Sequence, residues 1–310
     1  MTEDHPKVNF GKTGVLLINL GTPDSTDWLD IRKYLKEFLS DRRVIETNPF
    51  FWQIILNVFI LNLRPSKTAK AYKEIWMKKE NMSPLRYYTT RQTDKLRKKN
   101  TDGDVIIDYA MRYGNPSIRS VLNKLQRQGC EKLIILPLYP QYAAATTATV
   151  CDEVYKTLMK MRWQPSLHVV PHYESNKLYI KAIVSSLREK LNEIDWKPDL
   201  VVASYHGIPK KYFDKGDPYH CYCHKTSRLI KETFNKDIPI LTTFQSRFGP
   251  QEWLQPYTDK TLENLPKEGK KNILVISPGF SSDCVETLEE ISIQGKESFL
   301  ESGGGKFDTI

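Results

Sequence analysis

The chain has 310 residues, of which 40% are hydrophobic and 27% charged, and its formal net charge is +9. This composition excludes a disordered or low-complexity chain, and the length allows one large or two medium domains with an ample core. The positive charge favours anionic partners, but the sequence has no RRM, KH, helix-turn-helix or basic-zipper pattern, so we expect no nucleic-acid partner. The polar first residues resemble neither a signal nor a transit peptide, and five irregularly spaced cysteines indicate reduced thiols, so the sequence predicts a cytoplasmic protein.

Apolar runs that predict strands alternate along the chain with amphipathic stretches that predict helices. The strands are expected at residues 14–20, 105–110, 133–138, 167–170, 200–204, 238–242 and 273–276. The helices are expected at residues 28–39, 66–78, 118–128, 147–160, 177–192, 225–234 and 284–299. Continuous apolar strands that alternate with helices are typical of parallel sheets covered on both faces.

The residues that follow the predicted strands repeat in the same order in the two halves of the chain. Gly-x-Pro begins at Gly21 and again at Gly207, "RYGNP" has a counterpart in "RFGP", and "LPLYP" is loosely matched by "SPGF". We therefore predict an α/β protein of two similar Rossmann-like domains with parallel sheets, residues 12–165 and 166–310. Because open α/β sheets bind ligands outside the carboxyl ends of their strands, we expect the active cleft between these domains.

The longest apolar stretch, "PFFWQIILNVFILNL" at residues 49–63, is too short to span a membrane. It is either a helix of the core or a partly exposed apolar lip, and such a lip would contact a membrane surface or surround an apolar ligand. The flanking cations suit an anionic bilayer and predict peripheral contact with the inner face of a membrane: Arg42, Arg43, Arg64, Lys67 and Lys70. Arg64 and Lys67 also suit an amphiphilic acid whose carboxylates face water.

Two polar strand exits are candidates for function. His206 directly follows a predicted strand in "SYHGIP", where Gly207 and Pro209 form a tight exit. A histidine at such a rigid edge can act as a general base or a metal ligand, and a structural role is the alternative. Arg112 and Tyr113 follow an earlier strand and could recognise an anion or line a cleft.

The segment "SPGFSSDCVETLEEI" places four carboxylates within two helical turns. Asp283 as N-cap with Glu286 three residues later predicts a capping box. Glu290 lies one turn beyond Glu286 on the same face, so this pair can bind a divalent cation or relay protons. Glu289 is expected to be a solvated surface charge.

The motif "HCYCH" at residues 220–224 invites a zinc or iron–sulfur interpretation, but C-x-C is not the usual C-x₂-C spacing. A [2Fe–2S] cluster would need distant cysteines in addition, and its candidate ligands are Cys151, Cys221, Cys223 and Cys284. We favour ordinary thiols at these positions and keep the cluster as the alternative.

Several long motifs follow one another along the chain: "NLGTP", "YLKEFLSDRRVIE", "MRYGNPSI", "PLYPQYAAATTATV", "SYHGIPKKYFDKGDPYHC", "FQSRFGPQEWLQPYTD" and "PGFSSDCVETLEEI". Over residues 12–308 the chain resembles the ferrochelatase family, and most of all its Gram-negative bacterial members. The resemblance implies a chelatase-like pair of Rossmann-like domains and a lyase that inserts Fe²⁺ into protoporphyrin IX, the terminal step of haem biosynthesis. It implies these two substrates and no cofactor beyond the substrate iron.

The resemblance also implies roles for individual residues. Metal and proton chemistry falls to His206 and Glu286, with Glu290 and Asp283 in the same acidic line, and the roles of base and first iron ligand both stay open for His206. Arg112 and Tyr113 match residues on the other porphyrin face that are proposed for metal delivery. The implied substrate contacts are Arg64, Lys67 and Ser83 for the propionates, and Leu20, Tyr139, Trp253 and Phe280 for an apolar pocket.

Two alternatives and three departures from the family pattern accompany this interpretation. Insertion of iron into coproporphyrin III is the closest alternative, but the four carboxylates of that porphyrin do not suit the apolar lip. A non-enzymatic carrier of porphyrin or haem is the second alternative, and it would not need the line of carboxylates Asp283, Glu286 and Glu290. "KENMSPL" replaces a glycine-rich lead-in, so we expect the loop of Ser83 to differ. Cys284 stands where animal relatives often have histidine, and family members usually continue through another helix after "GGGKFDTI".

Overall fold

The computed structural model describes residues 9–310, so the first eight residues, which hold most of the polar N-terminal stretch, lie outside the described residues. The chain divides into two compact units. The first comprises the residues up to Leu138 together with Ala144–Pro171, and the second comprises Tyr139–Ala143 and His172–Ile310. The first unit continues past the predicted boundary at residue 165 because β4 (Ser166–Val169) pairs in parallel with β3 of the same sheet.

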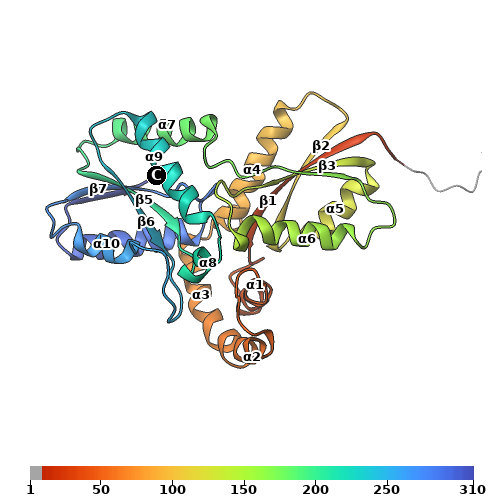
Figure 1. Ribbon diagram of the computed structural model, residues 1–310, viewed down its shortest axis with the longest axis horizontal. Helices are drawn as coiled ribbons and strands as arrows, with labels where there is room; N and C mark the ends of the chain where they lie inside the picture. Colours follow the sequence, from red (N-terminus) through yellow and green to blue (C-terminus); the bar gives the residue numbers. More distant parts are fainter. Residues whose placement is uncertain (1–8) are drawn as a thin grey trace, which may run out of the picture. The chain divides into compact units, whose positions relative to one another are not determined.

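The first unit is built on a parallel sheet of four strands in the order β2-β1-β3-β4. Its other strands are β1 (Lys12–Thr22), β2 (Val105–Gly114) and β3 (Cys130–Pro137). Its helices are α1 (Trp28–Leu39), α2 (Pro49–Ile55), η1 (Leu56–Ile60), α3 (Leu61–Ile75), α4 (Pro84–Lys99), α5 (Ile118–Arg127), η2 (Ala144–Ala148) and α6 (Thr149–Leu158). Figure 1 shows α4 on one side of this sheet and α5 and α6 on the other, so the apolar centre of β1 is buried on both faces.

The second unit repeats this topology, with parallel strands in the order β6-β5-β7-β8. Its strands are β5 (Leu200–His206), β6 (Ile240–Gln245), β7 (Asn272–Ile276) and β8 (Lys306–Thr309). Its helices are α7 (Lys177–Glu193), α8 (Lys210–Asp214), α9 (Tyr219–Phe234), α10 (Thr258–Asn264), η3 (Glu286–Gly295) and α11 (Lys296–Glu301). The prediction of two similar α/β units with parallel sheets is confirmed.

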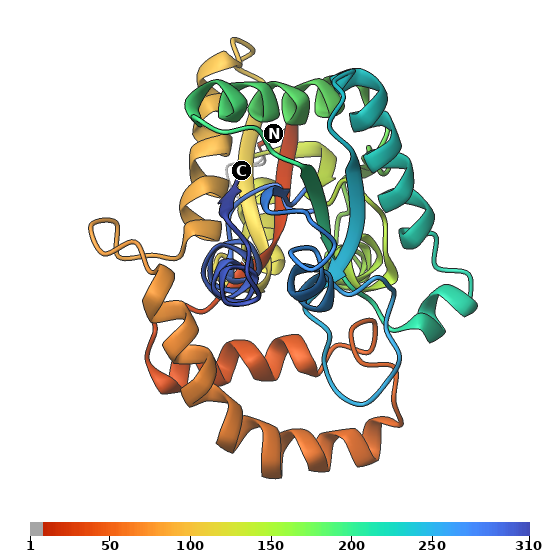
Figure 2. The same cartoon turned by 90° about the vertical axis from the view of Figure 1, so that its left-hand side faces the viewer.

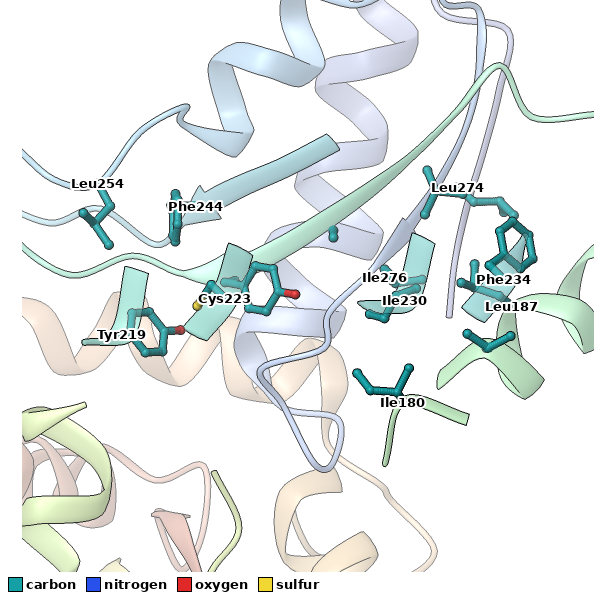
Figure 3. Close-up of a cluster of buried hydrophobic side chains, with 14 of the residues drawn as sticks. Ile180, Leu187, Tyr219, Cys223, Ile230, Phe234, Phe244, Leu254, Leu274 and Ile276 are labelled. Carbon is teal, nitrogen blue, oxygen red and sulfur yellow. The ribbon is translucent and has the colours of Figure 1, made fainter. Parts of the chain in front are cut away.

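The side chains of β5 alternate between two buried clusters, because successive residues of a strand point to opposite faces. Val201 and Ala203 pack with residues of α7 and α9, including Phe234, in the cluster drawn in Figure 3. Leu200 and Val202 pack on the other face with residues of α10, η3 and α11. The second sheet is therefore covered on both faces, as its continuous apolar strands predict.

The apolar stretch at residues 49–63 forms α2, η1 and the start of α3. Leu56 and Leu61 are fully buried, and the indole nitrogen of Trp52 donates to the carbonyl oxygen of Leu39 at 2.7 Å. Seven large apolar side chains of this segment, called the arm below, are 44–75% exposed: Phe50, Phe51, Ile54, Ile55, Val58, Phe59 and Leu63. Figure 2 shows the arm in orange, away from the sheet of its own unit. The exposed side chains agree with the interpretation as a partly exposed lip rather than as a core helix, and its contact with a membrane or a ligand stays a prediction. No helix within residues 9–310 combines the length and the hydropathy needed to cross a membrane.

Candidate active site

The second sheet changes its direction of winding at β5, which lies between β6 and β7. The carboxyl ends of β5 and β7 therefore form a topological switch point, the place where open α/β sheets bind ligands. His206 is the last residue of β5 and is half-buried. The chain leaves β7 at the same edge and leads into η3, which carries the carboxylates.

The backbone around His206 fixes the protonation of its ring. Nδ1 of His206 lies 2.6 Å from the carbonyl oxygen of Gly207. Because a carbonyl oxygen only accepts hydrogen bonds, Nδ1 carries the proton and the lone pair of the neutral ring lies on Nε2. Position 207 requires glycine, since a Cβ there would lie 2.9 Å from the carbonyl oxygen of Gln245 and 3.2 Å from the ring of Trp253. Nε2 is thus the atom that can accept a proton or bind a metal.

Glu290 is held by Ser246, the first residue after β6. The backbone N–H of Ser246 donates to Oε1 of Glu290 at 2.7 Å, and its hydroxyl donates to Oε2 at 2.5 Å. Burial raises the pKa of Glu290 above its usual value and the charge of Glu286 adds to the rise, whereas Ser246 and the charge of His206 oppose it. His206, Glu286 and Glu290 are therefore close enough to form one electrostatic group.

Gln245 ties the acidic helix to the sheet. Its Nε2 donates to the carbonyl oxygen of Glu286 at 2.7 Å, and its Oε1 accepts from the hydroxyl of Ser204 at 2.6 Å. The next residue, Ser246, has a left-handed φ of 64°, a strained conformation often found at functional sites. No role was predicted for either residue, although both lie in the strand exit "FQSRFGP".

The start of the acidic helix differs from the predicted capping box by one residue. Thr287, three residues after Cys284, accepts from the Cys284 backbone N–H at 3.0 Å and donates its hydroxyl to Asp283 at 3.0 Å. Thr287 therefore replaces Glu286 as the residue that returns to the helix start. The carboxylate of Glu286 is left outside the cap, and after burial it is the main cause of the raised pKa of the Cys284 thiol.

The three glutamates of the acidic helix, Glu286, Glu289 and Glu290, make different contacts. Residues Glu286–Gly295 are π-helical, a form that occurs often at functional sites. Glu289 accepts a hydrogen bond from Nε2 of Gln294 and is half-buried, like Glu286 and Glu290. The group near His206 therefore combines one imidazole nitrogen with the carboxylates of Glu286 and Glu290, which can relay protons, although the three side chains are not arranged to hold a metal ion.

Arg112 and Tyr113 lie in the first unit within a network around Asp41. The carboxylate of Asp41 accepts from Arg112, from the hydroxyl of Tyr113 at 2.9 Å and from the hydroxyl of Thr149. Burial alone would raise the pKa of Asp41, but hydrogen bonds from Thr149, the Arg43 backbone and Tyr113, with the charge of Arg112, hold it below the usual value. Tyr113 is fully buried and the Arg112 side chain is only 12% exposed, so both side chains serve an internal network rather than an open anion site.

The predicted propionate contacts are in different environments. Ser83 is the N-cap of α4: its hydroxyl accepts from the backbone N–H of Arg86 at 3.2 Å, and the residue is 1% exposed. Ser83 therefore has a structural role at the start of α4, and its predicted contact with a propionate stays a prediction. Arg64 is half-buried on α3, where burial lowers the pKa of its guanidinium, and Lys67 is exposed three residues later.

The predicted apolar contacts are all half-buried: Leu20, Tyr139, Trp253 and Phe280. Leu20 belongs to the first unit and the other three belong to the second. The ring of Trp253 has its centroid 6.4 Å from that of His206, and its indole nitrogen donates to the carbonyl oxygen of Phe248 at 3.0 Å. Trp253 is therefore an apolar wall beside the histidine.

The cysteines are free thiols with different exposures. Cys223 and Cys284 are buried, and burial raises the pKa of both, whereas Cys221 is exposed. Within residues 9–310 no group of three or more His, Cys, Asp or Glu residues is arranged to hold a metal ion. The four cysteines considered for a [2Fe–2S] cluster, which also include Cys151, are not gathered into such a group.

Comparison with known proteins gives one family over nearly the whole chain. The family model described as Ferrochelatase matches residues 12–310. Ferrochelatase of Allorhizobium ampelinum is 57% identical over 312 residues, which cover 100% of this chain and 91% of that protein. Ferrochelatase of Francisella tularensis subsp. novicida is 53% identical over 304 residues, covering 97% and 90%. The solved structure of SirB from Bacillus subtilis with Fe³⁺ is similar in fold alone, with a TM-score of 0.57 at 10% identity over 97% of this chain and 88% of that chain.

Proposed function

The chain belongs to the ferrochelatase family and is a lyase that inserts ferrous iron into a porphyrin in haem synthesis, and from this premise we propose that His206, Glu286 and Glu290 carry its chemistry on protoporphyrin IX. The observation that supports these residues most strongly is the carboxylate of Glu290. This carboxylate accepts two hydrogen bonds from Ser246 and has a raised pKa. The charges of His206 and Glu286 both act on its pKa.

The reaction requires two protons to leave and one cation to enter. A free-base porphyrin carries two pyrrole N–H protons, so iron insertion needs a base near the ring and a route that carries protons away. With its Nδ1 proton directed at the carbonyl oxygen of Gly207, the neutral ring of His206 has a free lone pair on Nε2 that can accept a pyrrole proton. Glu290, with its raised pKa, can then take up and release protons nearer to neutral pH than an ordinary carboxylate can. Glu286, which lies beside Glu290 and outside the helix cap, supplies negative charge for the incoming Fe²⁺.

Asp283 belongs to this proposal as a positioning residue. Its carboxylate accepts the hydroxyl of Thr287, and Thr287 in turn accepts from the Cys284 backbone. This pair of hydrogen bonds fixes the start of the helix that presents Glu286. We expect Asp283 to act through helix geometry rather than through contact with the porphyrin.

The substrate we propose is a porphyrin with a large apolar edge and few carboxylates. Protoporphyrin IX, with two propionates, suits the exposed apolar arm at residues 49–63 better than coproporphyrin III, with four. We propose that Arg64 and Lys67 receive the propionates, because a guanidinium and an ammonium next to apolar surface suit an amphiphilic acid. Leu20, Tyr139, Trp253 and Phe280, all half-buried, are proposed as apolar contacts of the ring.

We further propose that the arm at residues 49–63 docks on the cytoplasmic, inner face of an anionic membrane. Its seven exposed large apolar side chains include Phe50 and Phe51, and exposed cations such as Lys67 and Lys70 follow in α3. Apolar insertion together with attraction to anionic lipids is the usual basis of such binding. A membrane location would bring the enzyme to a poorly soluble substrate.

An anaerobic insertion assay tests the proposed function. Fe²⁺ is supplied with protoporphyrin IX or coproporphyrin III, and the intact chain is compared with His206→Ala, while porphyrin affinity is followed by fluorescence. We expect preference for protoporphyrin IX, and loss of at least about 100-fold in turnover by the variant with retained porphyrin binding, the scale of general base catalysis. Preference for coproporphyrin III would overturn the substrate assignment. Tight binding without insertion by the intact chain would favour a carrier.

A further inference from the structure

A pair of histidines on α9 lies on the face of the second sheet opposite to His206. The ring of His220 stacks on Phe244, with centroids 5.7 Å apart and planes at 21°. Phe244 belongs to the cluster under α7 and α9, whereas the next residue of β6, Gln245, points to the other face and binds Glu286. The histidine pair is therefore separate from the acidic helix.

The two imidazoles are neighbours with restricted positions. His220 and His224 are four residues apart on α9, so they share one face of the helix, and their ring centroids are 4.4 Å apart. Phe213 packs edge-on against His220 at 5.2 Å, and Phe244 lies 6.1 Å from His224. Three aromatic contacts of this kind hold the pair in place before any ligand arrives.

The ring nitrogens of both histidines are available. Across residues 9–310, no protein group forms a hydrogen bond with the imidazole of His220 or His224. Burial lowers the pKa of His220 and of His224, and the neighbouring His220 lowers that of His224 further. Both shifts favour the neutral imidazole, which has a free lone pair and is the form that binds metals.

We propose that His220 and His224 together chelate a single divalent transition-metal ion, of the class of Zn²⁺, Ni²⁺ or Cu²⁺, on the face of α9 that lies against Phe244. The two histidines are four residues apart on a helix, the same spacing as the two zinc-binding histidines of H-E-x-x-H helices. Since the described residues offer no third His, Cys, Asp or Glu ligand in place, water completes the coordination. The site would hold a metal away from the face on which iron insertion is proposed.

Calorimetric titration of the intact, metal-free chain with Zn²⁺ tests this proposal. Excess Mg²⁺ is included to occupy carboxylate sites, because imidazole prefers Zn²⁺ while carboxylates also accept Mg²⁺. The test variants are His220→Phe, which keeps a ring stacked on Phe244, and His224→Ala, at an exposed position. His168→Ala removes an exposed histidine elsewhere and is the matched control.

We expect one Zn²⁺-binding event that each test variant weakens by at least about tenfold, a loss that even outer-sphere partners of a metal can cause, whereas any Zn²⁺ bound near His206 should be unaffected by these variants. The His168→Ala control should bind Zn²⁺ like the intact chain, and Cu²⁺ should bind more tightly than Zn²⁺. Unchanged Zn²⁺ affinity in both test variants would overturn the proposal. Loss of Zn²⁺ binding in Cys221→Ser together with unchanged binding in His220→Phe would also overturn the proposal, because the site would then depend on the exposed thiol of Cys221. Either result leaves the proposed iron insertion untouched, since neither histidine belongs to it.

Discussion

Replacing Ser246 by alanine should move the proton chemistry of Glu290 by a predictable amount. The Ser246 hydroxyl donates one of the two hydrogen bonds that Ser246 gives to this carboxylate, and it opposes the effect of burial on the pKa. A hydrogen bond to a charged group contributes about 1.5–3 kcal/mol, and one pKa unit corresponds to about 1.4 kcal/mol. Ser246→Ala should therefore raise the pKa of Glu290 by about one to two units. Alanine meets the same constraint at a φ of 64° as serine does, so backbone strain changes little.

The assay is the pH dependence of kcat for iron insertion. If ionised Glu290 is required, activity falls as the pH drops through its pKa, so the acid limb of Ser246→Ala should shift to higher pH by about one to two units. Ser292→Ala is the matched control, because Ser292 lies on the same π-helix and its hydroxyl donates to the carbonyl oxygen of Thr287 at 3.0 Å. An acid limb that coincides in Ser246→Ala and the intact chain would refute the proposed role of Glu290. Equal shifts in Ser246→Ala and Ser292→Ala would attribute the effect to the helix instead.

Three further predictions concern the first unit. Asp41→Asn should lower the free energy of unfolding by about 3 kcal/mol at neutral pH, because it leaves the cation of Arg112 poorly paired in a buried network. The pKa of Asp41 is lower in the folded than in the unfolded protein, so Asp41 stabilises the fold above the unfolded pKa near 4, and this stabilisation is lost as the pH falls through the folded pKa. In urea unfolding, the difference in free energy of unfolding between the intact chain and Asp41→Asn should therefore shrink on acidification. A difference that stays constant with pH would contradict this prediction. Ser83→Ala should cost about 1 kcal/mol of stability through loss of the N-cap and leave KM for the porphyrin unchanged, whereas a raised KM at unchanged stability would identify Ser83 as a substrate contact. Phe50→Ser combined with Phe51→Ser should weaken flotation with anionic liposomes by about 100-fold or more, since two exposed phenyl rings are worth about 3 kcal/mol or more on burial; binding that persists would argue against docking through the arm.

The parallel sheets could be predicted because their strands are apolar on both faces. Each predicted apolar run overlaps an observed strand, although β3 and β4 end one residue earlier than predicted and β6 begins two residues later, and the helix at 28–39 is found with the predicted bounds. Two elements have weaker signals. α4 is a polar helix that presents little apolar periodicity, and Ser83 before Pro84 was its main clue. β8 follows a glycine-rich turn, in which Gly303 and Gly304 close the end of α11, and its pairing with β7 depends on contacts across the chain.

Residues of the candidate site could be predicted from the sequence only where they directly follow a strand or recur at a helical spacing. His206 ends a buried strand, and the predicted interaction of Glu286 with Glu290 agrees with the effect of Glu286 on the pKa of Glu290, on which the charge of His206 also acts. Ser246 could not be ranked from the sequence, because its importance arises from a left-handed backbone that aims its N–H at a distant carboxylate. Tyr113 shows the opposite case: its motif suggests an exposed contact, but packing buries it against Asp41.

The division of the acidic helix is tested most directly by two neighbouring substitutions of the same chemistry. The anaerobic rate of Fe²⁺ insertion into protoporphyrin IX is measured for Glu286→Gln and for Glu289→Gln, with folding checked by urea denaturation. Glu286 lies in the group near His206, whereas Glu289 makes an exposed contact with Gln294. We predict that Glu286→Gln loses at least about 100-fold in kcat and that Glu289→Gln stays within about twofold of the intact chain. Equal rates for the two folded variants would contradict the assignment of the metal and proton chemistry to the inward face of this helix.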